Sequence, residues 1–128
     1  MNTLQRILCV EDEADIQAVA RMALELVGGF QVQVSGSGEE ALRQLQTYVP
    51  DLILLDVMMP GMDGPSTLKA LRALPGMAAV PVVFMTAKVQ PSEVALYRAL
   101  GALDVIAKPF DPMTLSDQVR AIWERGRG

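Results

Sequence analysis

Acidic side chains follow two apolar runs of this chain, directly where each run ends. Glu11 and Asp12 follow residues 7–10, and Asp56 follows residues 52–55. If the two runs are neighbouring strands, these carboxylates crowd together and repel one another unless a cation lies between them. Magnesium takes hard oxygen ligands, keeps several waters and often bridges to a phosphoryl oxygen. The three carboxylates therefore predict a magnesium site.

Two other polar residues also follow apolar runs. Thr86 follows residues 80–85, and Lys108 follows residues 105–107. In open α/β sheets the ligand site lies beyond the carboxyl ends of the strands. We therefore expect three carboxylates, one hydroxyl and one ammonium group to meet at one edge of a sheet.

The absent residue types restrict the chemistry further. The chain has no His, which excludes Ser-His and Cys-His catalysis, imidazole metal ligands and a phosphohistidine formed on the chain itself. Its one Cys, Cys9, lies inside an apolar run and is predicted to be a small buried hydrophobe. Zinc is disfavoured for the same reasons.

The composition is typical of one compact domain. The 128 residues are 51% hydrophobic and 20% charged, which excludes intrinsic disorder. The net charge of -4 disfavours attraction to a phosphate backbone, so we expect no direct binding of nucleic acid. No apolar run approaches the ~18 residues of a membrane span, and the first residues do not resemble a signal peptide. We therefore expect a cytoplasmic domain with no membrane contact.

Short apolar runs alternate with amphipathic stretches of helical period, which is the pattern of βαβ units on a parallel sheet. The predicted strands are residues 7–10, 30–34, 52–55, 80–85 and 105–107. The predicted helices are residues 16–27, 39–48, 65–74, 92–100 and 114–125. The first helix is expected to bury Ile16, Val19, Ala20, Ala23 and Val27. Leu96 and Trp123 lie off the predicted core stripes and are candidates for a contact surface.

Four segments together resemble the motifs of a response-regulator receiver domain. They are ILCVEDE at residues 7–13, DLILLDVMMPGMDG at 51–64, MTA at 85–87 and KPF at 108–110. The resemblance covers nearly the whole chain, and the motifs occur in the right order. It implies an α/β, flavodoxin-like (CheY-like) three-layer sandwich with a five-stranded parallel sheet of order 2-1-3-4-5 and five helices. It also implies that residues 1–128 form one receiver domain, with no second domain.

The resemblance implies that this domain acts in a two-component phosphorelay. Asp56 would be the phosphoacceptor, and its phosphoryl donor would be a sensor histidine kinase or a phosphotransfer protein. Glu11, at a position where the family more often has Asp, would bind Mg²⁺ directly or through water, together with Asp12, Asp56 and the backbone carbonyl of Met58. The domain would be a signalling receiver that assists its own phosphorylation and dephosphorylation, not an enzyme.

The resemblance also implies a conformational switch that controls a downstream output protein or domain. Lys108 would pair with one phosphoryl oxygen, and Thr86 would bond another once phosphate arrives. The Lys108–Pro109 peptide bond would be cis. Val105 departs from the family, where many members have Tyr or Phe, so we expect a smaller packing change in the fourth helix and fifth strand.

Two other classes of protein compete with this interpretation. A magnesium-dependent phosphohydrolase with an Asp nucleophile, such as a haloacid-dehalogenase-like enzyme, needs an acid/base Asp where this chain has Met58. A flavodoxin-like electron carrier needs a phosphate loop after the first strand, where this chain has three acidic residues at 11–13. Within the receiver class, a single-domain regulator and a receiver from a longer regulator both stay open.

Overall fold

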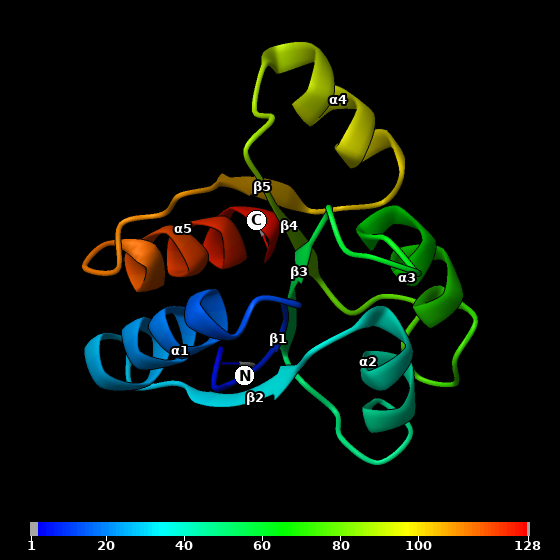
Figure 1. The fold of residues 1–128 in the computed structure, drawn as a ribbon, viewed down its shortest axis with the longest axis horizontal. Coiled ribbons are helices and arrows are strands. Elements are labelled where there is room, and N and C mark those ends of the chain that lie inside the picture. Colours follow the sequence, from blue (N-terminus) through cyan, green and yellow to red (C-terminus); the bar gives the residue numbers. More distant parts are fainter. Residues whose placement is uncertain (1–2, 128) are drawn as a thin grey trace.

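The structure is a computed structural model that describes residues 3–127. Within this range, five strands alternate with five helices, the first of which ends in a π-helical turn, η1 (Figure 1). The strands are β1 (Arg6–Val10), β2 (Gln31–Ser35), β3 (Leu52–Asp56), β4 (Val82–Thr86) and β5 (Asp104–Ala107). The helices are α1 (Ala14–Met22) with η1 (Ala23–Val27), α2 (Gly38–Gln44), α3 (Gly64–Arg72), α4 (Pro91–Ala99) and α5 (Leu115–Arg127). None of the helices in this range is both long and apolar enough to cross a membrane.

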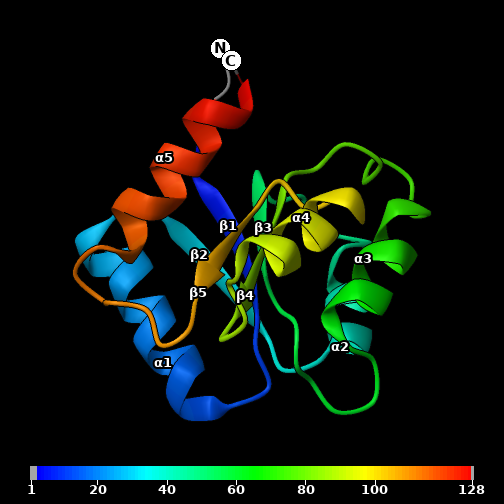
Figure 2. The ribbon, with the colours of Figure 1, turned by 90° about the horizontal axis from the view of Figure 1, so that it is seen from above.

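All five of these strands are parallel and lie in the order β2-β1-β3-β4-β5. Helices α1 and α5 cover one face of the sheet, and α2, α3 and α4 cover the other (Figure 2). The predicted three-layer fold and strand order are confirmed. This topology brings the carboxyl ends of β1, β3, β4 and β5 to one edge.

The core consists of two apolar layers, one on each face of the sheet. Successive residues of a strand point to opposite faces. In β1, Ile7 and Cys9 therefore pack on the α1–α5 side, whereas Leu8 and Val10 pack on the other side, and all four are fully buried. Burial, with a smaller contribution from nearby carboxylates, raises the pKa of the Cys9 thiol to about 12. The prediction that Cys9 is a buried hydrophobe is confirmed.

The first helix buries a different stripe from the predicted one. Val19 and Val27 are 40% and 47% exposed, and Leu24 is fully buried instead. The π-helical turn η1 holds more residues per turn than an α-helix, which rotates Val27 off the buried stripe, whereas Val19 lies before this turn. The Phe30 N–H donates to the Leu24 carbonyl at 3.0 Å and closes this turn against β2.

The second helix ends four residues earlier than predicted, at Gln44 rather than at Tyr48. Both Thr47 and Tyr48 donate their N–H groups to the Gln44 carbonyl, at 3.1 and 2.8 Å. The chain therefore turns back on the helix end before Pro50 is reached. At the other end, the Ser37 hydroxyl caps the helix by accepting from the Glu40 N–H.

The two residues predicted to lie off the core stripes differ in their surroundings. Leu96 is 56% exposed, as expected. The prediction for Trp123 is wrong, because this side chain is only 8% exposed and packs in the layer between α5 and the sheet. Trp123 follows Val119 by four residues, so it continues the buried stripe of α5.

We expect Leu54→Ala to lower the free energy of unfolding by about 3 kcal/mol, because it opens a cavity in the central strand. Leu54 is fully buried, whereas Leu26 is 79% exposed. The same substitution at Leu26 is the matched control and should change stability by less than about 0.5 kcal/mol. Urea denaturation of both variants measures the difference. Equal losses would contradict the assignment of the core.

Candidate functional site

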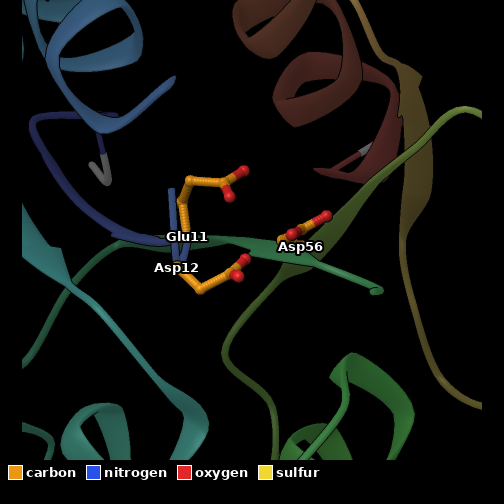
Figure 3. Close-up of side chains that lie close together, drawn as sticks. All are labelled: Glu11, Asp12 and Asp56. Carbon is orange, nitrogen blue, oxygen red and sulfur yellow. The ribbon is translucent and has the colours of Figure 1, made fainter. Parts of the chain in front are cut away.

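Three carboxylates meet at the carboxyl ends of two neighbouring strands. β1 and β3 pair directly, so the residues that end or follow them lie side by side. One carboxylate oxygen from each of Glu11, Asp12 and Asp56 lies within 4.8 Å of the other two (Figure 3). Glu11 is fully buried and Asp56 is 2% exposed. The structure thus brings together the three acidic side chains predicted from the sequence.

Lys108 lies between two of these carboxylates. Its Nζ atom is 2.8 Å from Glu11 Oε1 and 3.2 Å from Asp56 Oδ1. The Lys108 side chain is 17% exposed, so both ion pairs are largely screened from water. The Lys108–Pro109 peptide bond is cis, as the resemblance implies. One ammonium group therefore pairs with two buried carboxylates.

Thr86 completes the edge at the end of β4. The register pairs Asp56 with Met85, so Thr86 lies one residue further along the neighbouring strand. Its side chain is buried, and its hydroxyl oxygen accepts a hydrogen bond from the Lys88 N–H at 3.1 Å. The hydroxyl keeps its own proton as a donor. Thr86 therefore fixes the start of the loop that leads to α4.

Burial dominates the electrostatics of these groups. It raises the pKa of both Glu11 and Asp56, and Lys108 opposes this only in part. Burial would lower the pKa of Lys108, but the contacts with Glu11 and Asp56 raise it above its ordinary value. With three acidic groups and one ammonium group, the edge has an excess of formal negative charge. It is therefore suited to binding a cation.

Asp12 provides a direct test of whether a metal ion fits here. Its Oδ1 atom is buried and accepts no hydrogen bond from the described residues. Buried polar atoms in proteins are nearly always satisfied, so this oxygen needs a partner. Three hard oxygen donors within 4.8 Å are the ligand type that Mg²⁺ prefers. The residues therefore fit a divalent cation, and the part of the Met58 carbonyl in binding it stays a prediction.

Sequence reasoning missed two residues that support the site. The Gln17 side-chain amide donates to the Glu11 carbonyl at 2.5 Å and fixes the loop after β1. Gly64 begins α3 so close to β3 that a Cβ atom would lie 2.6 Å from the Asp56 carbonyl oxygen. Nothing in the sequence indicates the Gln17 contact. The only signal for Gly64 is a glycine directly after the helix-capping Asp63.

The family model described as "Response regulator receiver domain" matches residues 7–120. The DNA-binding response regulator MtrA of Mycobacterium tuberculosis is 43% identical over 122 residues, covering 94% of this chain and 52% of MtrA. The alkaline phosphatase synthesis transcriptional regulatory protein PhoP of Bacillus subtilis is 40% identical over 121 residues, covering 94% of this chain and 49% of PhoP. The chain thus spans about half the length of these relatives.

Solved structures agree with the fold. The chemotaxis protein CheY4 of Vibrio cholerae has a TM-score of 0.86 and 29% identity, covering 94% of this chain and 99% of CheY4. A CheY-like response regulator receiver domain protein of Methanospirillum hungatei has a TM-score of 0.80 and 26% identity, covering 98% of each chain. Both are similar to this chain over nearly its whole length.

We expect Asp56→Asn to stabilise the protein at pH 7 when no divalent cation is present, by on the order of 1 kcal/mol. A carboxyl whose pKa is raised on folding binds more protons in the folded state, so its contribution to stability falls as the pH rises through the folded pKa. The gain should therefore shrink as the pH falls towards the ordinary Asp value of 3.8.

Urea denaturation at neutral and acid pH measures this effect, and Asp117→Asn on the exposed side of α5 is the control. The control should change stability by less than about 0.5 kcal/mol at either pH. A less stable Asp56→Asn protein at pH 7 would mean that pairing with Lys108 outweighs the cost of burial.

Proposed function

This chain belongs to the response-regulator receiver domain family, and from that membership we propose that Asp56 accepts a phosphoryl group from a phosphohistidine of a partner protein. The family acts in two-component signal transduction. One observation carries the assignment to Asp56: its buried carboxylate ends β3 beside two other carboxylates, with Lys108 Nζ at 3.2 Å. We propose that residues 1–128 act as one receiver domain.

The proposed reaction is a phosphoryl transfer between two side chains. A carboxylate oxygen of Asp56 attacks the phosphorus of the phosphohistidine and forms a new P–O bond. The P–N bond breaks, and its electron pair stays on the imidazole nitrogen of the donor. The product is an acyl phosphate on Asp56. The donor is a sensor histidine kinase or a phosphotransfer protein, since this chain has no His of its own.

The acidic side chains would hold Mg²⁺. Its ligands would be Glu11, Asp12, Asp56 and the backbone carbonyl of Met58. When bound, the ion supplies positive charge that offsets the negative charge of the transferring phosphoryl group. Lys108 already lies beside Asp56, so its ammonium group would pair with a phosphoryl oxygen after a small movement away from Glu11.

Thr86 would convert phosphorylation into a change of shape. Its hydroxyl would donate its proton in a hydrogen bond to a phosphoryl oxygen, which draws the hydroxyl away from the Lys88 N–H. That N–H lies in the loop that leads to α4, so the loop and helix would take a new position. A downstream output protein or domain would bind differently to the two positions of α4.

We propose that this reaction takes place in the cytoplasm, and that the domain makes no direct contact with nucleic acid or membrane.

The domain would also influence the lifetime of its own phosphoryl group. Receiver domains place two residues that limit the approach of water, two positions after the acceptor Asp and two after the Thr. Here these are Met58, which is 69% exposed, and Lys88, which is also exposed. Neither side chain is a general base at neutral pH, and both are long enough to cover the phosphorus. Self-dephosphorylation should therefore be slow, and the phosphoryl group on Asp56 should survive for minutes or longer.

The residue type at position 58, two residues after Asp56, argues against a phosphohydrolase. Such an enzyme needs an acid/base group two residues after its nucleophile, and the thioether of Met58 cannot transfer a proton. The carboxylates of the site have other roles in this proposal, because Glu11 and Asp56 are both paired with Lys108 and Asp12 would be a metal ligand.

We expect Asp56→Asn to abolish labelling by radioactive acetyl phosphate in the presence of Mg²⁺, because an acyl phosphate on Asp56 needs its carboxylate. The wild-type label should be lost in hydroxylamine and absent when EDTA replaces Mg²⁺. Asp117→Asn is the control and should be labelled like the wild type. Undiminished, acid-stable labelling of Asp56→Asn would overturn the assignment of the phosphoacceptor.

We expect Met58→Asn to speed the release of phosphate by roughly fivefold, or about 1 kcal/mol of barrier, because an amide can hold the attacking water. The matched control is Met113→Asn, since Met113 is equally exposed but lies in the loop after β5. Phosphate release from purified, phosphorylated proteins measures both rates. A rate in Met58→Asn that is unchanged or slower would refute the shielding by Met58 and leave Asp56 as the acceptor.

A further inference from the structure

Helix α4 contacts the sheet through one buried ring and one exposed ion pair, in which the Arg98 guanidinium lies 2.9 Å from Asp104 of β5. Of the side chains of α4, all of which the structure describes, only that of Tyr97 is buried. The neighbouring apolar residues Leu96 and Leu100 are 56% and 49% exposed. An amphipathic helix normally buries a stripe of several side chains. The apolar packing of α4 against the sheet therefore depends mainly on Tyr97.

The partner of Tyr97 is a second aromatic ring, on the strand that carries the switch residue. The Tyr97 and Phe84 ring centroids are 5.3 Å apart with an interplanar angle of 76°, an edge-to-face contact. Phe84 is fully buried in β4. It precedes Thr86 by two residues, so both side chains point to the same face of the sheet. One strand thus holds both the anchor of α4 and the hydroxyl that faces the site.

The β4–β5 register places this ring pair beside Val105. Phe84 pairs with Val105 across the two strands, and Val105 packs, partly buried, against the same apolar layer as Tyr97. Val105 stands where many receiver domains have an aromatic side chain on the fifth strand. In this chain, the ring next to Phe84 comes from α4 instead.

Helix α4 is therefore held in different ways at its two ends. The loop before it is held by the hydrogen bond from the Lys88 N–H to the Thr86 hydroxyl. The last turn of the helix is held by the buried ring of Tyr97 on Phe84 and by the more exposed Arg98–Asp104 ion pair. Movement of the Thr86 hydroxyl breaks the first attachment and leaves the second in place. A helix held at one end and released at the other pivots between two defined positions.

We propose that the ring of Tyr97 is the fixed point about which α4 pivots when Thr86 engages a phosphoryl group, and that it takes the place of the ring missing at Val105. Tyr97 is a positioning residue in this scheme, since it touches neither Asp56 nor the phosphoryl group. The inference rests on the proposed function, because it needs Thr86 to respond to the state of Asp56. Without the Tyr97 ring, α4 has no single defined position before phosphorylation. Phosphorylation therefore no longer moves the helix from one defined position to another.

Beryllofluoride with Mg²⁺, a mimic of the phosphoryl group, tests the proposal. Backbone amide chemical shifts and amide hydrogen exchange are measured before and after its addition, for wild type, Tyr97→Leu, Tyr97→Phe and the surface control Leu100→Ala. In Tyr97→Leu, the amides next to Asp56 should shift as in wild type. Those of α4 should exchange roughly tenfold faster before addition and respond little to it. Tyr97→Phe and Leu100→Ala should behave like wild type.

The two Tyr97 variants separate the contribution of the ring from that of the hydroxyl. A wild-type α4 response in Tyr97→Leu overturns the proposal, and so does a loss of response in Tyr97→Phe, since that variant keeps the ring. If Tyr97→Leu does not fold, Phe84→Leu takes its place, because it removes the other ring of the pair. Its α4 response to beryllofluoride is then measured in the same way, and a wild-type response overturns the proposal. If wild type shows no shifts next to Asp56, both the proposal and the proposed function fail. If the amides next to Asp56 shift, but the response of α4 is the same in Tyr97→Leu and Phe84→Leu as in wild type, the proposal fails and the proposed function stands.

Discussion

The repulsion among three clustered carboxylates, two of them buried, is the constraint around which this structure is organised. One carboxylate oxygen from each of Glu11, Asp12 and Asp56 lies within 4.8 Å of the other two, and among residues 3–127 Lys108 is the only cation paired with Glu11 and Asp56. Such a cluster opposes folding at neutral pH, because burial raises the pKa of Glu11 and of Asp56 and so favours their neutral forms. The fold supports it by placing the cluster on strands that are apolar on both faces. The same strands thus stabilise the fold through their buried apolar side chains and carry at their ends the charged groups that oppose folding.

The fold was predictable where a pattern repeats and unpredictable where a local contact decides. The five apolar runs and their polar ends indicate a parallel sheet, because strands buried on both faces need continuous apolar sequence. The exposure of Val27 was not predictable, since a π-helical turn after Met22 shifts the side chains that follow. The burial of Trp123 depends on α5 continuing its stripe past Val119. Hydrophobic periodicity predicts the presence of a helix more reliably than it predicts which side chains of that helix are buried.

The site was predictable because its residues end strands of one parallel sheet. Asp56 and Thr86 each end a strand and Lys108 follows one, so their convergence follows from topology. Contacts that depend on the packing of separate elements gave no such signal. The bond from Gln17 to the Glu11 carbonyl depends on how α1 returns over its own loop. The contact of Tyr97 with Phe84 depends on how α4 crosses β4, although the absence of a ring at residue 105 was visible in the sequence.

The two residues that would contact the phosphoryl group already have partners in the unphosphorylated state. Lys108 pairs with Glu11 and Asp56, and the Thr86 hydroxyl accepts from the Lys88 N–H. Leaving a buried donor or acceptor unpaired costs on the order of 1–3 kcal/mol, so intermediate arrangements are disfavoured. A phosphoryl group offers both residues new partners at the same moment. If Asp56 is phosphorylated as proposed, the site would favour two complete sets of contacts over a continuous range, and phosphorylation would exchange one set for the other.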